Sequence, residues 1–167
     1  MLDFMRVQKE IQETVCFTGH RKLGMPEREL EKKTADLIWK AIQKGYTHFI
    51  SGAAVGYDLI AAEQVIMIRD IGVGLLKPIT LEIAIPCENQ TKNWSAKQKR
   101  HYQLVLDNAD VISEAKMPYS SKAMMNRNKF MVSKSALVIA YYEQGRTGGT
   151  KNAIEYAEGQ GREVWYV

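Results

Sequence analysis

The chain has 167 residues, of which 46% are hydrophobic and 25% charged, the composition of a soluble globular protein. Its net charge of +4 is too small to predict nucleic-acid binding by itself. Cys16 and Cys87 predict no disulfide framework and favour a cytoplasmic location. The histidines and cysteines lack zinc-ligand spacing, and no segment resembles a signal peptide or a membrane span, so we expect neither a metal nor a membrane partner.

Strands and helices are predicted to alternate along a single domain of residues 13–167, after an extension of residues 1–12 without a strand pattern. The expected strands cover residues 14–18, 46–50, 81–86, 110–114, 136–142 and 163–167. The expected helices cover residues 26–44, 59–70, 95–109, 122–134 and 151–157. We expect Glu82 at the rim of the third strand, and a capping box at Ser95 and Gln98. The alternation predicts an α/β fold, a Rossmann-like doubly wound, mostly parallel sheet of about six strands with helices on both faces. The direction of the last strand remains open.

Ligands of such folds bind beyond the carboxyl ends of the strands, and four predicted loops meet there. These loops cover residues 18–21, 51–58, 86–94 and 145–150. In the last one a glycine-rich turn separates a strand from a helix, an arrangement that points backbone N–H groups at an anion. The alternative is an ordinary tight connection in which the glycines only supply a positive φ.

Several side chains in and near these loops suit a nucleotide. Arg21, Arg127 and Arg146 are candidates for charge-assisted bonds to phosphate. Asp58 is a candidate acceptor for a ribose hydroxyl, or else it caps its own helix. Trp94 either stacks on a base or covers the edge of the sheet. For His20 the alternatives are a bond to a ligand and a bond to the backbone.

Other classes of site find less support. The chain has no G-x-G-x-x-G after its first strand and no G-x-x-x-x-G-K-[ST], which counts against an NAD oxidoreductase and a P-loop NTPase. A basic cluster is formed by Lys92, Lys97, Lys99, Arg100 and His101. We interpret this cluster as a solvated helix face rather than a nucleic-acid site.

Several motifs in one order resemble the YpsA family of uncharacterised bacterial proteins, over about residues 13–167. They are Val15-Cys-Phe-Thr-Gly-His-Arg21, Ser51-Gly-Ala-x-x-Gly-x-Asp58, Ile85-Pro-Cys-x-x-Gln90 with Trp94, Arg127-Asn128 with Met131, and Gly148-Gly-Thr150 with Tyr156-Ala157. The resemblance implies membership of the SLOG superfamily, Rossmann-like domains related to the Lonely Guy enzymes and to DprA. With the loops described above, it implies ligand-binding roles for Gly19, His20, Arg21, Ser51, Gly52, Gly56, Asp58, Trp94, Arg127, Asn128, Gly148, Gly149 and Thr150.

The chain departs from the pattern of the Lonely Guy enzymes, which cleave nucleoside monophosphates between base and ribose phosphate. Asn128 replaces a lysine, and Ala153 stands where the pattern has a glutamate. Alanine cannot activate water or stabilise an oxocarbenium-like ribose, and Glu155 should point about 200° away around the helix. We therefore expect a non-catalytic domain that binds or senses a nucleotide or a nucleotide-derived small molecule, with no required cofactor.

Two alternatives remain open. One is a phosphoribohydrolase that uses Asp58 or Glu88, and the other is DprA-like binding of single-stranded nucleic acid through the basic cluster. We expect a small nucleotide-like molecule as the partner rather than nucleic acid, and leave a homodimer open.

Arg127 shares a helical face with Met124 and Met131, at positions i, i+3 and i+7, so this arginine is expected to lie on a buried side. It then needs a partner, because a buried unpaired guanidinium is costly. The candidates are an anionic ligand near the turn at Gly148–Thr150 and a salt bridge to Asp58 or another acidic side chain.

Overall fold

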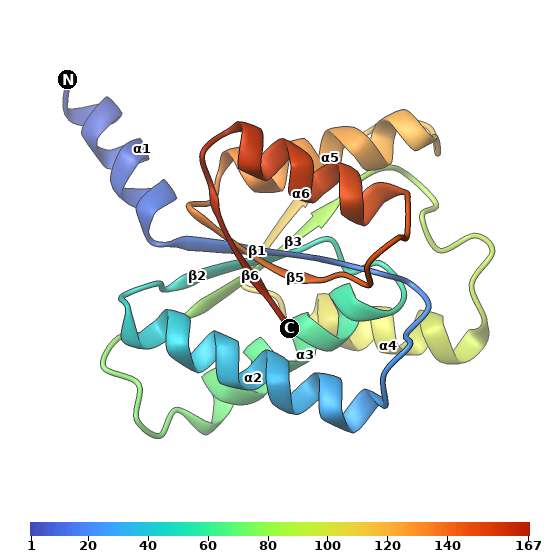
Figure 1. Cartoon of the computed structure of the whole chain (residues 1–167), viewed down its shortest axis with the longest axis horizontal. Coiled ribbons are helices and arrows are strands. Elements are labelled where there is room, and N and C mark those ends of the chain that lie inside the picture. The colour runs from blue at the N-terminus through green and yellow to red at the C-terminus, as the bar shows by residue number, and fades with distance from the viewer.

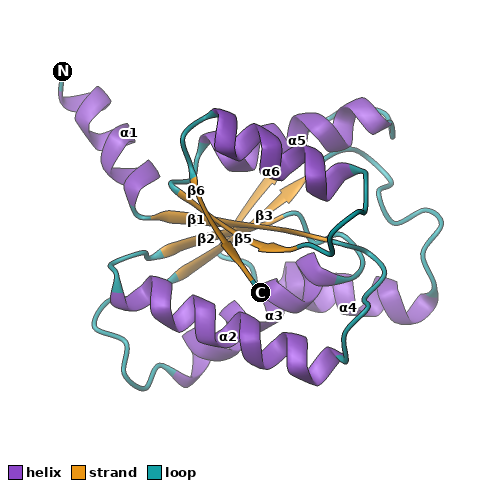
Figure 2. Cartoon of the chain, in the orientation of Figure 1, coloured by secondary structure: helices purple, strands orange, loops and turns teal.

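The computed structural model describes residues 1–167, apart from the side chain of Leu2 (Figures 1 and 2). The strands are β1 (Thr14–Gly19), β2 (His48–Ser51), β3 (Thr80–Ile85), β4 (Val111–Glu114), β5 (Leu137–Tyr141) and β6 (Glu163–Tyr166). The helices are α1 (Leu2–Gln12), α2 (Glu27–Gln43), α3 (Tyr57–Ile71), α4 (Ala96–Asp107), α5 (Ser121–Ser133) and α6 (Gly149–Gly159). The predicted capping box is present, since Ser95 and Gln98 each accept a backbone N–H of the other.

All six strands form one parallel sheet in the order β4-β3-β2-β1-β5-β6, which confirms the predicted Rossmann-like α/β fold. The sequence left the direction of the last strand open, and the structure pairs β6 parallel to β5, with Val138 opposite Val164. The strands nearest the centre are apolar on both faces, as parallel strands covered on both sides must be.

The strand order reverses between β1 and β5. From β1 the chain moves outward to β4 with α2, α3 and α4 on one face of the sheet (Figure 1). It then crosses back through α5 to β5 and continues through α6 to β6, with both helices on the opposite face (Figure 1). Right-handed crossovers in opposite directions require this division of the helices. The ends of β1 and β5 therefore flank the topological switch point, where such folds bind ligands.

Each face of the sheet has its own core. The larger one, under α2, α3 and α4, includes Phe17, Phe49, Leu30, Ile38, Tyr57, Val65, Leu81 and Val105. The smaller one, under α5 and α6, is built from Cys16, Ile50, Ala84, Met131, Val132, Val138 and Ala157. The core on the second face is thus smaller and contains fewer large side chains.

The N-terminal extension, for which no strand was predicted, forms the helix α1. It runs outward from the start of β1, away from the body of the domain (Figure 1). Thr14 Oγ1 donates to the carbonyl of Glu10 at 2.6 Å and connects the two elements. No described helix is both long enough and apolar enough to cross a membrane.

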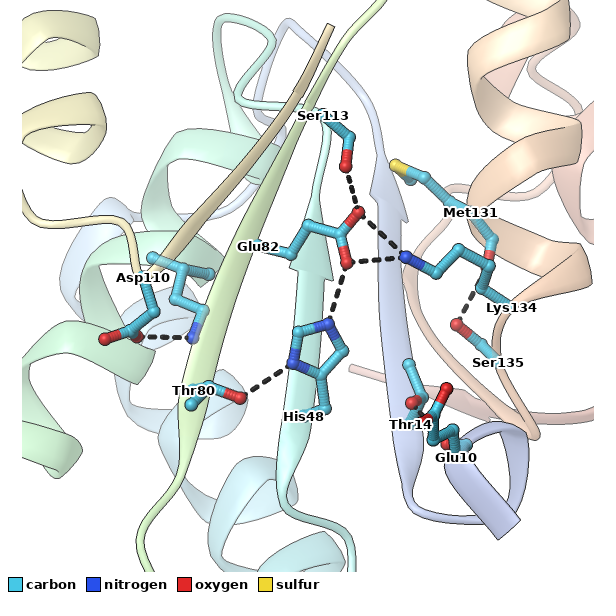
Figure 3. A network of polar contacts seen from close by, with 11 residues as sticks. Glu10, Thr14, His48, Thr80, Glu82, Asp110, Ser113, Met131, Lys134 and Ser135 are labelled. Carbon is cyan, nitrogen blue, oxygen red and sulfur yellow. Dashed lines mark hydrogen bonds and ion pairs between the residues drawn. The ribbon is translucent and has the colours of Figure 1, made fainter. Parts of the chain in front are cut away.

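Glu82 was predicted at the rim of its strand, and that prediction is wrong: only 1% of this side chain is exposed. Its carboxylate accepts hydrogen bonds from His48 Nε2 at 2.8 Å, from Lys134 Nζ at 2.8 Å and from Ser113 Oγ at 2.6 Å (Figure 3). Burial alone would raise the pKa of Glu82, but these bonds outweigh it and lower the pKa to about 2. The polar network joins β2, β4 and the end of α5 to β3.

Candidate functional site

A cleft of about 790 Å³ opens at the switch point, between the end of β1 and the first turns of α3, α5 and α6. Its size is that of a site for a small organic molecule. The residues that line it are Thr18, Gly19, His20, Arg21, Ala54, Asp58, Tyr119, Ser120, Ser121, Lys122, Met124, Met125, Arg127, Asn128, Lys129, Thr147, Gly149, Thr150, Asn152, Ala153 and Tyr156.

The N-terminus of α6 supplies backbone donors to this cleft. Gly148 is the N-cap, and Gly149 and Thr150 in the first turn line the cleft. The first N–H groups of a helix lack an intrahelical acceptor, and no described side chain caps α6. Because the helix dipole adds about half a positive charge at this end, the position suits an anion.

Arg127 reaches the cleft from α5 with 8% of its surface exposed. Its Nη1 donates to the carbonyl of Gly52 at 2.8 Å, and its Nε donates to Oδ1 of Asn128 at 2.9 Å. A Cβ on residue 52 would lie 1.9 Å from Nη1, so only glycine leaves room for the guanidinium. Among the described residues Arg127 bonds to these two partners and forms no salt bridge with Asp58, the alternative kept above.

Asp58 lies in the first turn of α3, lines the cleft and is 6% exposed. Its Oδ1 has no hydrogen-bond partner among the described residues. It does not cap α3, because Gly56 is the N-cap and no side chain bonds there. Burial raises the pKa of Asp58 to about 6, although the guanidinium of Arg127 works in the opposite direction. A buried carboxylate oxygen without a donor is costly unless a ligand supplies one.

The loops after β1 and β2 touch beside the cleft. Gly56 has a φ of +93°, and a Cβ there would lie 2.5 Å from the carbonyl oxygen of Arg21. The amide of Tyr57 donates to the carbonyl of His20 at 3.2 Å. Glycine is therefore required at position 56 both by its backbone conformation and by the approach of the neighbouring loop.

Arg146, a candidate for phosphate in the sequence, instead ties the loops after β1 and β5 together. Its Nη1 lies 2.9 Å from Oε2 of Glu143 and donates to the carbonyl of Lys22 at 2.9 Å. It is not among the residues that line the cleft. Arg146 thus has partners within the protein and connects two loops next to the cleft instead of contributing to its lining.

The structure brings most of the predicted site residues together. Those that line the cleft are Gly19, His20, Arg21, Asp58, Arg127, Asn128, Gly149 and Thr150. Four others are not part of the lining, namely Ser51, Gly52, Gly56 and Gly148. Ser51 Oγ supports a lining residue, since it donates to the carbonyl of Asp58 at 2.7 Å. Trp94 lies outside the cleft and packs edge-on against Tyr102, with ring centroids 5.4 Å apart. Its ring therefore does not stack on a ligand in this cleft, and its contact is with a side chain of α4.

The basic cluster also lies outside the cleft. Lys92, Lys97, Lys99 and Arg100 are exposed, whereas His101 is half-buried with Nε2 3.1 Å from Oε2 of Glu63.

Sequence reasoning missed one side of the cleft. Lys122, Met125 and Lys129 line it from α5, and Tyr119 and Tyr156 line it from the preceding loop and from α6. The three α5 residues occupy positions i, i+3 and i+7, a spacing that places them on one side of a helix. The spacing shows that these residues share one side of the helix, but it does not show that this side faces α6, so the sequence alone could not assign them to the cleft.

The fold and the cleft define a class: a Rossmann-like α/β domain with a cleft at its switch point. The protein belongs to the YpsA family, since the model described as the YspA SLOG family matches residues 15–166. This confirms the resemblance found in the sequence motifs.

Relatives and structural neighbours agree with this membership. The chain is 31% identical to the SPbeta prophage-derived protein YoqJ of Bacillus subtilis, over 82% of this chain and 86% of YoqJ. It is 28% identical to a UPF0398 protein of Bacillus cereus, over 85% and 74% of the two chains. Its fold is similar to that of DNA processing protein A from Helicobacter pylori, with a TM-score of 0.62 and 17% identity over 96% of this chain and 67% of the other. The same protein from Streptococcus pneumoniae gives a TM-score of 0.66 and 17% identity, over 97% of this chain and 52% of the other.

Proposed function

We propose that this domain binds a phosphate-bearing, nucleotide-type small molecule in the cleft at the switch point. The observation that carries the proposal is the unpartnered Oδ1 of Asp58, a buried carboxylate oxygen in the same cleft as the N-terminus of α6. The N-terminus of α6 suits an anion, and the carboxylate oxygen of Asp58 needs a hydrogen-bond donor. A nucleotide offers both, as a phosphate and as ribose hydroxyls.

The charges of the cleft support this division. Arg21 and Arg127 line it together with the first amides of α6, and these groups would hold the phosphate. Asp58 would accept from a ligand hydroxyl after a small movement of its surroundings opens the enclosed Oδ1 to the cleft, and this would relieve the cost of the unpaired oxygen only when the ligand is bound. Arg127 already has its guanidinium fixed by Gly52 and Asn128, so binding would lose little side-chain freedom.

Binding without catalysis fits the lining of the cleft. Ala153, which replaces the glutamate of the Lonely Guy pattern, lines the cleft and is buried. Glu155 is exposed and lies 3.6 Å from Lys151, so it faces away. Asp58 is the one carboxylate among the described residues of the lining, and Glu88 is not part of it. A phosphoribohydrolase would therefore have to work through Asp58.

A thermal-shift titration with AMP, ADP-ribose, adenosine and inorganic phosphate tests the proposal. A ligand at a hundred times its Kd adds about 2.7 kcal/mol of stability, which is roughly 5–10 °C in Tm for a domain of this size. AMP or ADP-ribose should stabilise more than adenosine or phosphate does alone. Absence of any shift at millimolar nucleotide would contradict the proposal.

Matched variants locate the site. Arg21 and Lys97 are both exposed cations, but only Arg21 lines the cleft. Arg21→Ala should weaken AMP binding, whereas Lys97→Ala should leave it unchanged.

Chromatography of the AMP samples distinguishes an enzyme from a binding protein. Release of free adenine that Asp58→Asn abolishes would make the protein a phosphoribohydrolase.

Single-stranded DNA is a second candidate ligand, favoured by one observation. Four cations line the cleft, namely Arg21, Lys122, Arg127 and Lys129, against the single carboxylate of Asp58. Tyr119 and Tyr156 add aromatic surface of the kind on which bases stack. The Helicobacter pylori neighbour is described by its single-stranded DNA binding mode, and this weakens our expectation that nucleic acid is not a partner.

Oligonucleotide titrations at several salt concentrations test this second candidate. Binding through the cleft should weaken steeply with salt, and Lys122→Ala with Lys129→Ala should weaken it more than Lys97→Ala with Lys99→Ala. If both double variants bind equally, the cleft is not the DNA site. If the cleft variants do weaken DNA binding, competition by AMP shows whether the small molecule and the DNA strand share this cleft.

A further inference from the structure

His20 occupies a fixed position at the end of β1. Its ring lies between Tyr141 and Tyr142, with ring centroids 5.9 Å and 5.5 Å away. Only 6% of the residue is exposed, and what remains open belongs to the lining of the cleft. The two aromatic neighbours leave the imidazole little freedom to turn.

The position of one proton on this ring follows from its hydrogen bond. The backbone N–H of Glu143 donates to His20 Nε2 at 3.0 Å. A backbone amide can only donate, so Nε2 must carry a lone pair, and the neutral ring must carry its proton on Nδ1. Burial, and then the charge of Arg146, lower the pKa of His20, which keeps the ring neutral at pH 7.

The second ring nitrogen has no protein partner. Among the described residues His20 makes no hydrogen bond through Nδ1, and Nδ1 is not one of the fully buried atoms that lack a partner. An N–H with no acceptor in the protein and some remaining exposure is available to the cleft that the residue lines.

We propose that His20 is a ligand-recognition residue whose Nδ1–H donates to an acceptor atom of the bound nucleotide, and that the Glu143 amide sets its tautomer. This inference rests on the proposed function and adds to it one uncharged donor among the cationic groups. Such a donor distinguishes a ligand with an acceptor atom at this point from one with only an ammonium or amide N–H there, because two facing donors repel.

Several charged groups lie near the ring, in the chain or in the cleft. Arg21 and Lys22 follow it in the chain, and Glu143 and Arg146 lie on the loop after β5. Asp58 and Arg127 line the same cleft from α3 and α5. A second proton on the ring would have to bind to Nε2, where it would face the N–H of Glu143. The loop after β5 therefore favours the neutral ring with its proton on Nδ1.

Two substitutions separate the two nitrogens. The side-chain oxygen of His20→Gln reaches the position of Nε2 and can accept from Glu143, but this variant has no donor at Nδ1. The amide of His20→Asn reaches the position of Nδ1 and can donate into the cleft, but it leaves the Glu143 amide without its acceptor. We expect His20→Gln to keep its Tm and to bind AMP roughly tenfold more weakly or worse. His20→Asn should lose Tm and keep more of its affinity than His20→Gln does.

Nitrogen-15 NMR of the histidine side chains at pH 7 reads the tautomer directly, with the signal of His20 assigned by its absence from His20→Gln. The Nδ1–H form is expected, and addition of AMP should shift its Nδ1 signal. An Nε2–H ring, or AMP affinity that is equal in wild type and His20→Gln, overturns the donor role alone. A wild-type protein that binds neither AMP nor ADP-ribose overturns the proposed function and the donor role together, while the tautomer can still be read.

Discussion

Two buried carboxylates lie in the same domain in opposite states. Glu82 is 1% exposed and accepts hydrogen bonds from three side chains, and its pKa is lowered to about 2 (Figure 3). Asp58 is 6% exposed, has one oxygen without a partner and has its pKa raised to about 6. Burial disfavours the charge in both places, so the difference comes from the donors around each group.

This difference separates a carboxylate that the protein itself satisfies from one whose missing donor the proposed ligand would supply. The donors to Glu82 come from β2, β4 and the end of α5, so the protein itself satisfies the charge and gains a connection between these elements. At Asp58 the fold maintains a buried charge that it does not fully satisfy, at a cost in stability. Such a cost is expected where a ligand completes the hydrogen bonds.

The largest loss of folding stability is expected when the hydrogen-bonded carboxylate of Glu82 is removed. Glu82→Ala leaves His48 and Lys134 without their acceptor inside the sheet, and breaking one side of a buried ion pair costs about 3–5 kcal/mol. Because Lys134 is 42% exposed and can turn to water, we expect a loss of about 3 kcal/mol in urea denaturation at pH 7.

The control is Glu155→Ala, which removes an exposed glutamate with a surface partner and should cost under about 0.5 kcal/mol. The pH dependence has a definite sign. The folded pKa of Glu82 lies below its ordinary value of 4.5, so its stabilisation is complete above pH 4.5 and is lost as the pH falls toward about 2. The gap between wild type and Glu82→Ala should therefore narrow as the pH falls from 4.5 toward about 2, and a gap that keeps its full neutral-pH size over that range would mean that packing, not charge, carries the effect.

A smaller effect of opposite sign is expected at the unsatisfied charge. Asp58→Asn removes an ionised group whose burial is not compensated, so the ligand-free protein should gain about 1 kcal/mol at pH 7. The same variant should bind AMP at least about tenfold more weakly if Asp58 accepts a ligand hydroxyl. Urea denaturation gives the first quantity and calorimetric titration the second. A variant that is less stable than wild type and binds AMP equally well would make Asp58 a structural residue like Glu82.

Acidification should remove this gain. The folded pKa of Asp58, about 6, lies above its ordinary value of 3.8, so the folded state binds this proton more tightly than the unfolded chain does. Its contribution to stability is present below pH 3.8 and is lost as the pH rises through about 6. The stability advantage of Asp58→Asn should thus shrink from pH 7 to pH 5, because acid stabilises the wild type through Asp58, whereas it destabilises the wild type through Glu82.

The contrast also explains which parts of the site were predictable from the sequence. Gly56 and Gly149 belong to turns between a strand and a helix, and Arg127 lies on an otherwise apolar helix face. These features are visible in short stretches of sequence, so they could be predicted without knowledge of the whole fold. The place of Trp94 depends on strand order, because β3 ends two strands away from the switch point. The burial of Glu82 depends on donors from three distant segments, which no local pattern contains.

The smallest effect concerns a single donor within the satisfied network. Ser113 Oγ donates to Glu82 Oε1 at 2.6 Å from the edge strand β4, while His48 and Lys134 hold the same carboxylate from other sides. Ser113→Ala removes one of several charge-assisted bonds and leaves the charge paired, so a loss of about 1 kcal/mol is expected at pH 7. Ser133→Ala is the matched control, since the hydroxyl of Ser133 is exposed and donates to a backbone carbonyl at 2.8 Å. With one donor fewer the pKa of Glu82 should rise, and the acid-induced loss of stability should begin at higher pH in Ser113→Ala than in wild type. If Ser113→Ala costs as much as Glu82→Ala, the network acts as one unit and the charge of Glu82 depends on all of its donors at once.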